Sequence, residues 1–573
     1  MSVAKSLMAG RIVEESLFPY PHLRDKDREV LGMMIEAIDG FLDPRKDDFK
    51  RWDREAAQPA DFIQGLRDLG LFGLIVPEEH GGLGLSNAGY ARILSQTSTH
   101  DSSTTLTIGA HSSIGMKGIL LFGTPEQRAR YLPKLASGEM IAAFCLTEAG
   151  AGSDAASIRT KAEKNADGTW TLNGEKIWIT NGGIADLYTV FARTSSEAGK
   201  ISAFIVEAAW PGVSHGHHED KIGIRASSTT AVSFVDVKVP QTNVLDAEGK
   251  GFKVAMAILN NGRTGLGGGA VGGMKTLIAL ATQQAQARKQ FGEPIANYPL
   301  IREKISQMTL DCFAAESVVW MVAHYIDSAY DDYSVEAAIS KVFASEAIQR
   351  SANEALQIAG GSGFMRDFPY EQIVRDCRIL SIFEGTNEVL RLYIALSGLK
   401  ELGKSYGELK AAVDSIFNNP IKGFGVMADY GGKRLTHATG VGRDKILGKV
   451  PAPLREATTI FEKYTVELAK AADFLLRKYG KSIAARQHAL KRIADMTIDL
   501  FVGLCALSRA TALAAEPGDE GKQAMVIAHA FARQARRRLA NNVRRMERNE
   551  DEEMDLLAGF ILDRGRYPWD IIK

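Results

Sequence analysis

Cysteine is scarce in this chain, and no two cysteines have the spacing of a redox or metal-binding motif. The four of them, Cys145, Cys312, Cys377 and Cys505, lie far apart, which argues against a disulfide framework and predicts reduced core thiols. No apolar run approaches the ~18 residues that a membrane-spanning helix needs. The N-terminus has neither a secretory nor a transit signal. We therefore expect a cytoplasmic protein, either prokaryotic or already processed, without a structural metal.

An excess of charge is also missing, because 69 Lys and Arg balance 69 Asp and Glu. A protein whose main partner is nucleic acid would need a basic domain, so this class is disfavoured. The charge is unevenly distributed. Residues 401–573 hold 29 basic and 22 acidic side chains, a net of +7, which leaves −7 for residues 1–400.

One part of the basic region has an unusual composition. Residues Lys422–Lys449 contain seven glycines, six Lys and Arg and only two acids, which predicts a mobile basic segment. Near the end of the chain, Arg536–Arg538 and Arg544–Arg545 are followed by the acidic run Glu550–Glu553. We interpret this stretch as a solvated face that neutralises itself.

The hydrophobic periodicity divides the 573 residues into four parts, as their number allows. Residues 1–141 have helical spacing, and residues 142–245 have the alternation of strands. Helical spacing returns in residues 246–400 and continues in an additional helical module, residues 401–573. Because the strands form one block rather than alternating with helices, we predict a mainly α fold with a central β domain, not a Rossmann fold.

Two local patterns lead to specific structural predictions. Thr169–Leu172 and Glu175–Thr180 flank Asn173-Gly174, which predicts a β-hairpin with a type I′ turn. The glycine-rich stretch Gly262–Gly273 lacks the strand and the glycine register of a dinucleotide-binding motif. We expect its glycines to permit close helix packing, with Arg263 as the residue that needs another explanation.

The candidate chemistry lies in two segments far apart in the sequence. Ala143–Asp154 is rich in small residues, and its exposed backbone N–H groups suit a flat ring that accepts hydrogen bonds. Ile382–Arg391 places Glu384 after two apolar residues and before Gly385. Burial makes such a carboxylate a stronger base. Together the segments predict a redox ring that faces a proton acceptor, whereas His111 fits a core histidine better than a catalyst.

A second glycine cluster, Gln357–Gly363, allows two interpretations. Glycine at a helix C-terminus is usual in a capping turn, but it also allows the backbone to approach a pyrophosphate closely. Arg288 and Phe291 are candidates for contacts with a phosphate and with a ring. Taken alone, Arg288 would be interpreted as a surface charge and Phe291 as a core aromatic residue.

These segments resemble those of the acyl-CoA dehydrogenases, the FAD-dependent enzymes of fatty-acid β-oxidation. The resemblance extends from about Ala4 to Leu399 and includes the family signatures Phe144–Ser153, Gln357–Gly363 and Phe383–Glu388. It implies a helical N-terminal domain, a β-barrel-like middle domain and a helical bundle. The extra C-terminal helical domain resembles that of the very-long-chain enzymes and of acyl-CoA dehydrogenase 9.

The resemblance implies roles for individual residues in binding FAD. Residues that would hold the isoalloxazine edge are Phe144, Leu146, Thr147, Gly152, Ser153, Trp178, Ile179 and Thr180. Residues that would grip the ADP half of an FAD bound mainly by the neighbouring subunit of a homodimer are Arg288, Phe291, Gln357, Gly360 and Gly361. Residues that would close over the flavin are Thr386, Asn387 and Glu388.

It also implies the reaction and its catalytic base. Glu384 would remove the α-proton of a long-chain acyl-CoA while the β-hydride passes to the flavin, which gives a trans-2-enoyl-CoA. Two hydrogen bonds to the thioester carbonyl, one of them from the Glu384 N–H, would acidify that proton. Some relatives place the base at the position of Gly262, where glycine cannot serve. The substrate would be lined by Ser153, Asn260, Arg263, Phe383 and Gly385.

Chain length and partners are further expectations of the resemblance. Gly115 and Gly118 match two glycines that deepen the acyl pocket of very-long-chain enzymes, although tight helix packing would also explain them. Electron-transfer flavoprotein is the expected electron acceptor, and the segment Lys422–Lys449 would dock on an anionic membrane. The alternatives are a non-catalytic or dual-role assembly factor for a respiratory complex and an oxygen-dependent acyl-CoA oxidase.

Overall fold

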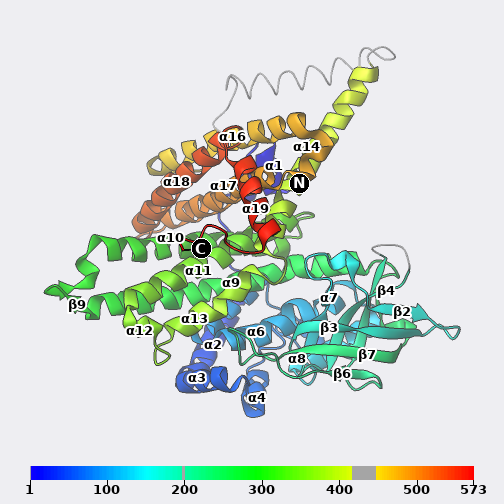
Figure 1. Cartoon of the computed structure of the whole chain (residues 1–573). Helices are drawn as coiled ribbons and strands as arrows, with labels where there is room; N and C mark the ends of the chain where they lie inside the picture. Colours follow the sequence, from blue (N-terminus) through cyan, green and yellow to red (C-terminus); the bar gives the residue numbers. More distant parts are fainter. Residues whose placement is uncertain (1, 196–199, 416–446, 573) are drawn as a thin grey trace. The chain divides into compact units, whose positions relative to one another are not determined.

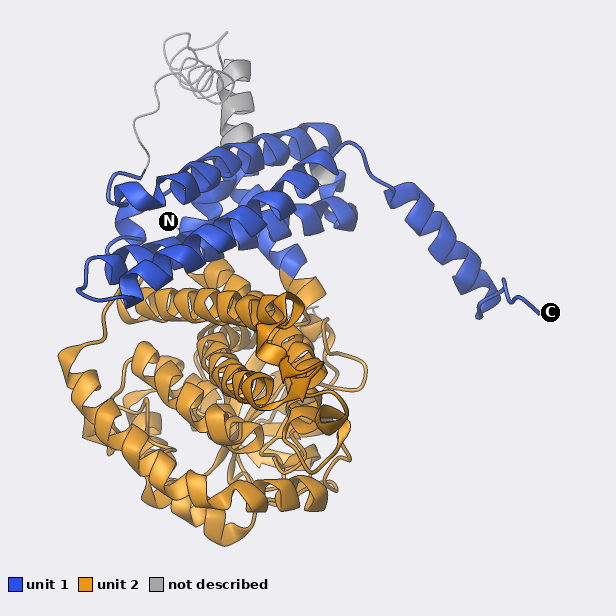
Figure 2. Cartoon of the chain, turned by 90° about the vertical axis from the view of Figure 1, so that its left-hand side faces the viewer, with its two compact units in different colours: residues 1–19, 391–573 blue, residues 20–390 orange. Residues whose placement is uncertain are grey.

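The computed structural model describes residues 2–195, 200–415 and 447–572. The chain divides into two compact units, Tyr20–Leu390 and Met1–Pro19 with Arg391–Lys573, which are coloured separately in Figure 2. Most of the predicted mobile basic segment, residues 422–446, lies outside the described residues. The mainly helical fold with one central sheet domain is as the sequence predicts (Figure 1).

The larger unit begins with helices whose first turns are capped by side chains. Ser86 accepts a hydrogen bond from Gly89 N–H at the start of α5, and Thr124 and Gln127 form a capping box at the start of α8. A π-helical turn, Ala110–Gly115, follows α6. The helices are α2 (Asp25–Leu42), α3 (Lys46–Glu55), α4 (Ala60–Asp68), α5 (Asn87–His100), α6 (Ser102–Gly109), α7 (Lys117–Phe122) and α8 (Pro125–Ser137).

The sheet domain has the strand order β6-β7-β3-β2-β4-β5-β8, with β1 parallel to β4. Strands β4 and β5 are buried along almost their whole length and form the centre of the domain. The strands are β1 (Ala142–Cys145), β2 (Lys161–Lys164), β3 (Trp170–Thr180), β4 (Leu187–Arg193), β5 (Ile201–Glu207), β6 (Val213–His215), β7 (Thr229–Val239) and β8 (Val244–Leu245).

The predicted hairpin at Asn173-Gly174 is wrong, because β3 runs through this dipeptide without a turn. Its pairing with β7 changes register between Leu172 and Gly174, as in a β-bulge. Gly174 has a φ of 151°, and a Cβ there would lie 2.7 Å from the Cα of Thr160. The glycine is therefore required by a close approach of backbones and not by a hairpin turn.

The third part of this unit is a bundle around the long helix α9, which packs against α5, α10 and α11. A Cβ on Gly268 would lie 2.4 Å from the Ala91 carbonyl oxygen, and one on Gly272 would lie 1.9 Å from that of Ser95. The prediction that these glycines permit close helix packing is confirmed. The helices are α9 (Gly251–Ala287), α10 (Pro299–Asp327), α11 (Ser334–Ala359), α12 (Gly361–Phe364), α13 (Tyr370–Cys377) and α14 (Asn387–Ser415).

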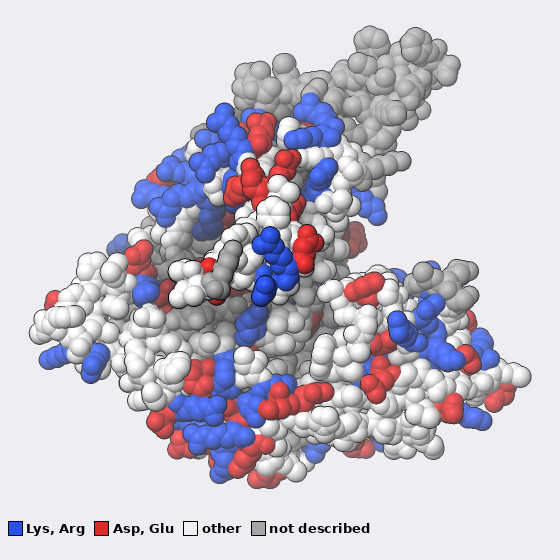
Figure 3. Space-filling view, in the orientation of Figure 1, with Lys and Arg blue, Asp and Glu red and all other residues white. Residues whose placement is uncertain are grey.

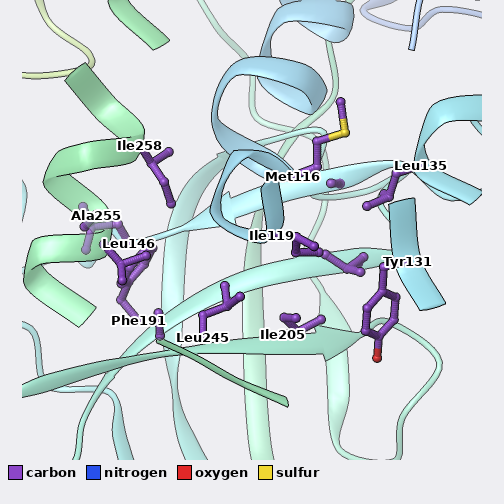
Figure 4. Packing of buried hydrophobic residues seen from close by; sticks show 14 of the residues in the cluster. Met116, Ile119, Tyr131, Leu135, Leu146, Phe191, Ile205, Leu245, Ala255 and Ile258 are labelled. Carbon is purple, nitrogen blue, oxygen red and sulfur yellow. The ribbon is translucent and has the colours of Figure 1, made fainter. Parts of the chain in front are cut away.

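A shared hydrophobic cluster joins the sheet to the helices on both sides of it. Figure 4 shows Ile119 and Leu135 from the N-terminal helices, Leu245 from the sheet and Ile258 from α9 in this cluster. All four side chains are fully buried. Since burying one such side chain contributes roughly 1.5–3 kcal/mol, the cluster fixes the three parts of the unit to one another.

The smaller unit is helical and consists of α1 (Val3–Met8), the greater part of α14, α16 (Arg455–Tyr479), α17 (Gln487–Ala514), α18 (Glu520–Arg544) and α19 (Asp551–Arg564). Helix α17 is apolar and long enough to cross a membrane, but 78% of its most apolar window is buried inside the protein. This burial is typical of a core helix.

Basic side chains gather over α18, as Figure 3 shows. Several of them pair with acids of the same unit. Arg538 binds Asp499 at 2.6 Å, and Arg533 binds Glu456 at 2.7 Å. Arg545 pairs with Glu550. These pairs agree with the prediction that acidic side chains neutralise the basic ones at this end of the chain.

Buried carboxyl groups lie where α3, α13 and the loop before β7 meet. Arg375 of α13 binds Asp53 of α3 at 2.8 Å and donates to the carbonyl of Ile222 at 3.1 Å. Beside it, Asp376 accepts a hydrogen bond from Ile224 N–H. Burial raises the pKa of Asp376 to about 8, and the nearby Asp101 and Asp53 add to this effect.

This junction predicts a pH dependence of stability. Asp376 takes up a proton on folding. Its contribution to the free energy of unfolding is therefore complete below about pH 4 and is lost as the pH rises towards about 8. Asp376→Asn keeps the acceptor for Ile224 and cannot ionise. We expect the melting temperature of the variant to fall less than that of the wild type between these pH values. Parallel curves for wild type, Asp376→Asn and the surface control Asp331→Asn would contradict this assignment.

Candidate functional site

The loop after β1 is held by a buried ion pair. The Lys176 ammonium group lies 2.6 Å from Oε1 of Glu148, and the two side chains are 0% and 9% exposed. Lys176 also donates to the carbonyl of Leu146 at 3.1 Å. Although burial of Glu148 acts in the opposite direction, Lys176 and further hydrogen bonds lower the pKa of this carboxyl. The loop is thus anchored by a carboxylate that stays ionised.

The same carboxylate binds the chain on the far side of the loop. It accepts hydrogen bonds from the N–H groups of Arg159 and Thr160, and Ile177 N–H donates to the carbonyl of Thr147 at 3.0 Å. Between these anchors the backbone is open, because a Cβ on Gly152 would meet nothing within 4 Å. The fixed and accessible backbone is the surface that the sequence predicts for binding a flat ring.

The predicted ring-binding residues fall into two groups by exposure. Trp178 is 63% exposed and has a φ of 56°, which is a strained conformation for a tryptophan. Gly152 and Ser153 are exposed, and Phe144, Thr147 and Thr180 are half-buried. Leu146 and Ile179 are buried and belong to two hydrophobic clusters of the unit. The predicted set thus combines accessible residues with core residues.

A hairpin after α9 carries two other predicted residues. It is formed by β9 (Lys289–Gln290) and β10 (Glu293–Pro294). Phe291 at its tip is 97% exposed with a φ of 53°, and Arg288 is exposed at its base. The ring of Phe291 lies edge-on to that of Tyr298, with the two centroids 6.3 Å apart. The hairpin thus leaves both predicted side chains accessible.

The glycine cluster after α11 forms an exposed turn. Gly360 caps the helix with a φ of 59°, and Gln357 and Gly361 are exposed beside it. A Cβ on either glycine would meet nothing within 4 Å. The capping turn is therefore present, and its open backbone also fits the pyrophosphate interpretation.

Glu384 lies in a short turn between α13 and α14 and has an unusual backbone. Its φ is 55°, and that of Gly385 is 93°. A left-handed conformation costs a residue with a Cβ roughly 1–2 kcal/mol. The carboxylate oxygen Oε2 is buried without a hydrogen-bond partner. Burial raises the pKa of Glu384, and the nearby charges of Arg263 and Lys341 oppose this rise.

The two neighbouring cations form hydrogen bonds with the backbone of the turn. Arg263 donates to the Glu384 carbonyl at 3.4 Å and to Oδ1 of Asn260 at 2.7 Å. Lys341 donates to the Gly385 carbonyl at 2.8 Å. In the described part of the chain, the Glu384 N–H donates to no acceptor. The turn thus offers an unpaired carboxylate and an available N–H side by side.

The remaining residues of this turn differ in their surroundings. Phe383 and Thr386 are half-buried, and Glu388 is exposed. Asn387 is buried, and its side chain bonds to Lys341, Ser345 and Glu346 of α11. Because these hydrogen bonds join the Asn387 side chain to α11, Asn387 fixes the position of the turn.

Tyr90 of α5 is buried, with Ser113 and Ser112 beside its hydroxyl. Burial raises the pKa of Tyr90, and the charge of Glu384 adds to this rise. His111 is also buried, but both its ring nitrogens are satisfied, by Leu135 O and Ala142 N–H. Its exposed fraction of 0% and these two bonds confirm its prediction as a core histidine. The burial also lowers its pKa to about 4.

Both glycines of the predicted acyl pocket are tightly packed. A Cβ on Gly115 would lie 2.7 Å from the carbonyl carbon and oxygen of Ala142 in β1. One on Gly118 would lie 3.1 Å from side-chain methyl groups of Leu245 and Ile258. This geometry favours the alternative explanation, close packing, most strongly at Gly115, where the obstacle is backbone.

The difference between the two glycines is testable by their alanine variants. We expect Gly115→Ala to destabilise the protein by about 1–3 kcal/mol, the usual cost of overpacking, because β1 cannot move aside. Gly118→Ala meets only flexible side chains and should cost clearly less. Chemical denaturation measures both. Equal loss of stability in the two variants would contradict the assignment of a backbone contact to Gly115 alone.

Three charged residues of the site were not predicted from the sequence. Lys176 and Lys341 each occupy an interior position of a strand or helix that otherwise looks ordinary, and Glu148 looks like a loop acid. A lysine within the apolar run Ala337–Ala344 is the only signal that could have indicated Lys341. The partners of all three are distant in the sequence.

Comparison with protein families matches four profiles to the chain in order. The N-terminal, middle and C-terminal domains of acyl-CoA dehydrogenase match residues 29–139, 143–237 and 249–399. The ACAD9/ACADV C-terminal domain matches residues 452–565.

Individual relatives align over most of the chain. The human very long-chain specific acyl-CoA dehydrogenase, a mitochondrial protein, is 43% identical over 520 residues, which cover 89% of this chain and 79% of that protein. A probable acyl-CoA dehydrogenase of Bacillus subtilis is 35% identical over 555 residues, 92% of this chain and 88% of that one.

Solved structures agree with these relatives. An acyl-CoA dehydrogenase from Bacillus anthracis, crystallised with FAD, superposes with a TM-score of 0.81 at 31% identity and covers 96% of this chain and 94% of its own. The butyryl-CoA dehydrogenase of Megasphaera elsdenii has a TM-score of 0.63 at 37% identity over 66% of this chain and 99% of its own.

Proposed function

We propose that this chain, which belongs to the FAD-dependent acyl-CoA dehydrogenase family, oxidises long-chain acyl-CoA to the trans-2-enoyl-CoA, with Glu384 as the catalytic base. The observation that supports it most is the state of Glu384, whose Oε2 is buried without a partner and whose pKa is raised by burial. A structural carboxylate in such a place would be paired.

The fit of FAD to the site has support from the loop after β1. A Cβ at Gly150 or Gly152 would meet only open space, so the backbone there is accessible to a planar ring. Thr147, Ser153 and the exposed Trp178 would hold the isoalloxazine, and Arg288 and Phe291 would reach the cofactor of a second subunit. Bound FAD supplies the hydride acceptor for the reaction.

The residues of the turn then perform the proton chemistry. Glu384 N–H would donate a hydrogen bond to the thioester carbonyl, which stabilises the negative charge that develops on its oxygen. The Glu384 carboxylate would take the α-proton at Oε2. A desolvated carboxylate is a stronger base than one in water. Burial therefore brings the basicity of Glu384 closer to that needed to remove the α-proton of a thioester. An apolar acyl chain would keep water away from the proton during transfer.

The base assignment predicts a large kinetic effect of Glu384→Gln. The amide has a similar shape but cannot accept the proton, so we expect the rate of flavin reduction by acyl-CoA to fall ~10²–10⁴-fold, the usual contribution of a general base. FAD content should be unchanged. Anaerobic stopped-flow bleaching of the flavin measures this rate.

Glu354→Gln provides the matched control, since Glu354 is another glutamate of this unit that binds Lys304 and lies outside the site. It should reduce the flavin at the wild-type rate. Undiminished flavin reduction in Glu384→Gln, or a purified protein that cannot bind FAD, would refute the proposed function.

Preference for long acyl chains is supported by 43% identity to the human very long-chain specific enzyme. Each buried methylene contributes about 0.8 kcal/mol, so a long pocket should favour long substrates steeply. Bleaching with saturated substrates from butyryl-CoA to stearoyl-CoA should show kcat/KM rising with length. A maximum at butyryl-CoA would contradict the long-chain assignment.

A homodimer is supported by exposed apolar side chains at one end of the helical bundle. Phe291 of the hairpin, Leu300 of α10 and Phe364 and Met365 beside α12 are 52–97% exposed. Exposed apolar side chains that gather in one place often mark a protein–protein contact. A second copy of the chain at this end would bury them and bring Arg288 and Phe291 to the cofactor.

Electron-transfer flavoprotein is the proposed electron acceptor and the cytoplasm the proposed location. The assembly-factor alternative would not need an unpaired base, so the state of Glu384 favours an enzyme. An oxidase would instead pass electrons to oxygen, and assays with either acceptor separate the two. Contact with an anionic membrane stays a prediction from the composition of Lys422–Lys449.

A further inference from the structure

Lys341 is a fully buried lysine in the middle of α11, with an exposed fraction of 0%. Removing an ammonium group from water costs several kcal/mol unless partners compensate. The partners here lie in the turn that carries Glu384. Lys341 Nζ donates to the Gly385 carbonyl at 2.8 Å and to Oδ1 of Asn387 at 2.9 Å.

Asn387 extends this contact by one helical turn. Its Nδ2 donates to Ser345 Oγ at 3.0 Å and to Glu346 Oε1 at 3.1 Å. Lys341 and Ser345 are four residues apart and share one face of α11. The segment after Glu384 is therefore held at two points, its backbone at Gly385 and its side chain at Asn387.

The held segment is strained and needs such support. Glu384 and Gly385 are successive residues with positive φ, 55° and 93°. A change of φ or ψ at Gly385 would swing the Glu384 carboxylate and its N–H away together. Lys341 binds the carbonyl of this peptide and forms no hydrogen bond to the carboxylate, whose Oε2 stays unpartnered.

We propose that Lys341 is a positioning residue for the base: it locks the Gly385 peptide so that the carboxylate and N–H of Glu384 face the thioester, and its charge, together with that of Arg263, favours the ionised carboxylate. The inference rests on the proposed function and deepens it. Arg263 holds the other carbonyl of the turn, and the charge of Lys341 acts on Glu384 through space.

The charges around Lys341 determine the direction of the pH effect. Burial lowers its pKa to about 8; Glu384 of the turn, Glu346 of α11 and Glu388 of α14 favour its charged form, and Arg263 of α9 opposes it. The positive charge in turn lowers the pKa of Glu384. Its removal should raise that pKa and move the acid limb of the rate profile to higher pH.

Lys341→Met tests the inference in the full-length protein loaded with FAD. The rate of flavin reduction by palmitoyl-CoA is measured between about pH 6 and pH 9, a range that includes the ionisation of a raised carboxyl. We expect the maximal rate to fall about 10- to 100-fold, as for a misplaced catalytic group, and the acid limb to shift upward. KM and FAD content should change little.

Two further variants make the result unambiguous. Lys304→Met is the matched control, because it removes another lysine that binds α11, through Glu354, and should leave rate and profile unchanged. Lys341→Gln retains a donor for the Gly385 carbonyl without the charge. It should lose less rate than Lys341→Met but show the same shift, and it replaces Lys341→Met if that variant fails to fold.

The outcome separates this inference from the proposed function. If Glu384→Gln is inactive while Lys341→Met and Lys341→Gln keep the wild-type rate and pH profile, Lys341 only packs the helix and the inference is overturned. A lower rate with an unshifted acid limb would also overturn the role of its charge. If Glu384→Gln is active, the proposed function itself fails.

Discussion

The interaction on which the site depends is the binding of two cations to peptide carbonyls of the turn that carries Glu384. Arg263 donates to the Glu384 carbonyl, and Lys341 donates to that of Gly385. A direct ion pair would hold Glu384 in its weakly basic form. Contact with the backbone instead stabilises a turn with two positive φ values and leaves Oε2 unpartnered. Structural strain and basicity are thus coupled in one short segment.

The arrangement differs at the predicted ring-binding loop, where a buried lysine pairs directly with a carboxylate. Glu148 and Lys176 form a buried pair whose additional hydrogen bonds go to the backbone at Leu146, Arg159 and Thr160. These bonds fix the conformation of the loop, and its exposed glycines leave the loop backbone accessible from outside. In the helical bundle, glycines of α9 bring this helix into contact with the backbone of α5. Close packing there sets where Arg263 stands relative to the turn.

The sequence allowed correct predictions wherever the cause is local. The helical periods, the glycine packing of α9 and the buried state of His111 each follow from neighbouring residues, and the resemblance located Glu384 in its signature. The hairpin at Asn173-Gly174 was wrong because a glycine that permits a turn also permits a close approach to Thr160. Lys341 and Lys176 were missed, since their partners lie 44 and 28 residues away and only the folded chain brings them together.

The central claim is that Glu384 is a desolvated, unpaired base, and its own titration tests this most directly. Infrared difference spectra of the wild type against Glu384→Gln isolate the carboxyl band of this residue as the pH is varied. We expect the band to titrate above the ordinary value of 4.5, and to move further upward in Lys341→Gln. A carboxyl group that titrates at or below the ordinary value would show that the base is paired or solvated and would contradict this account of the site.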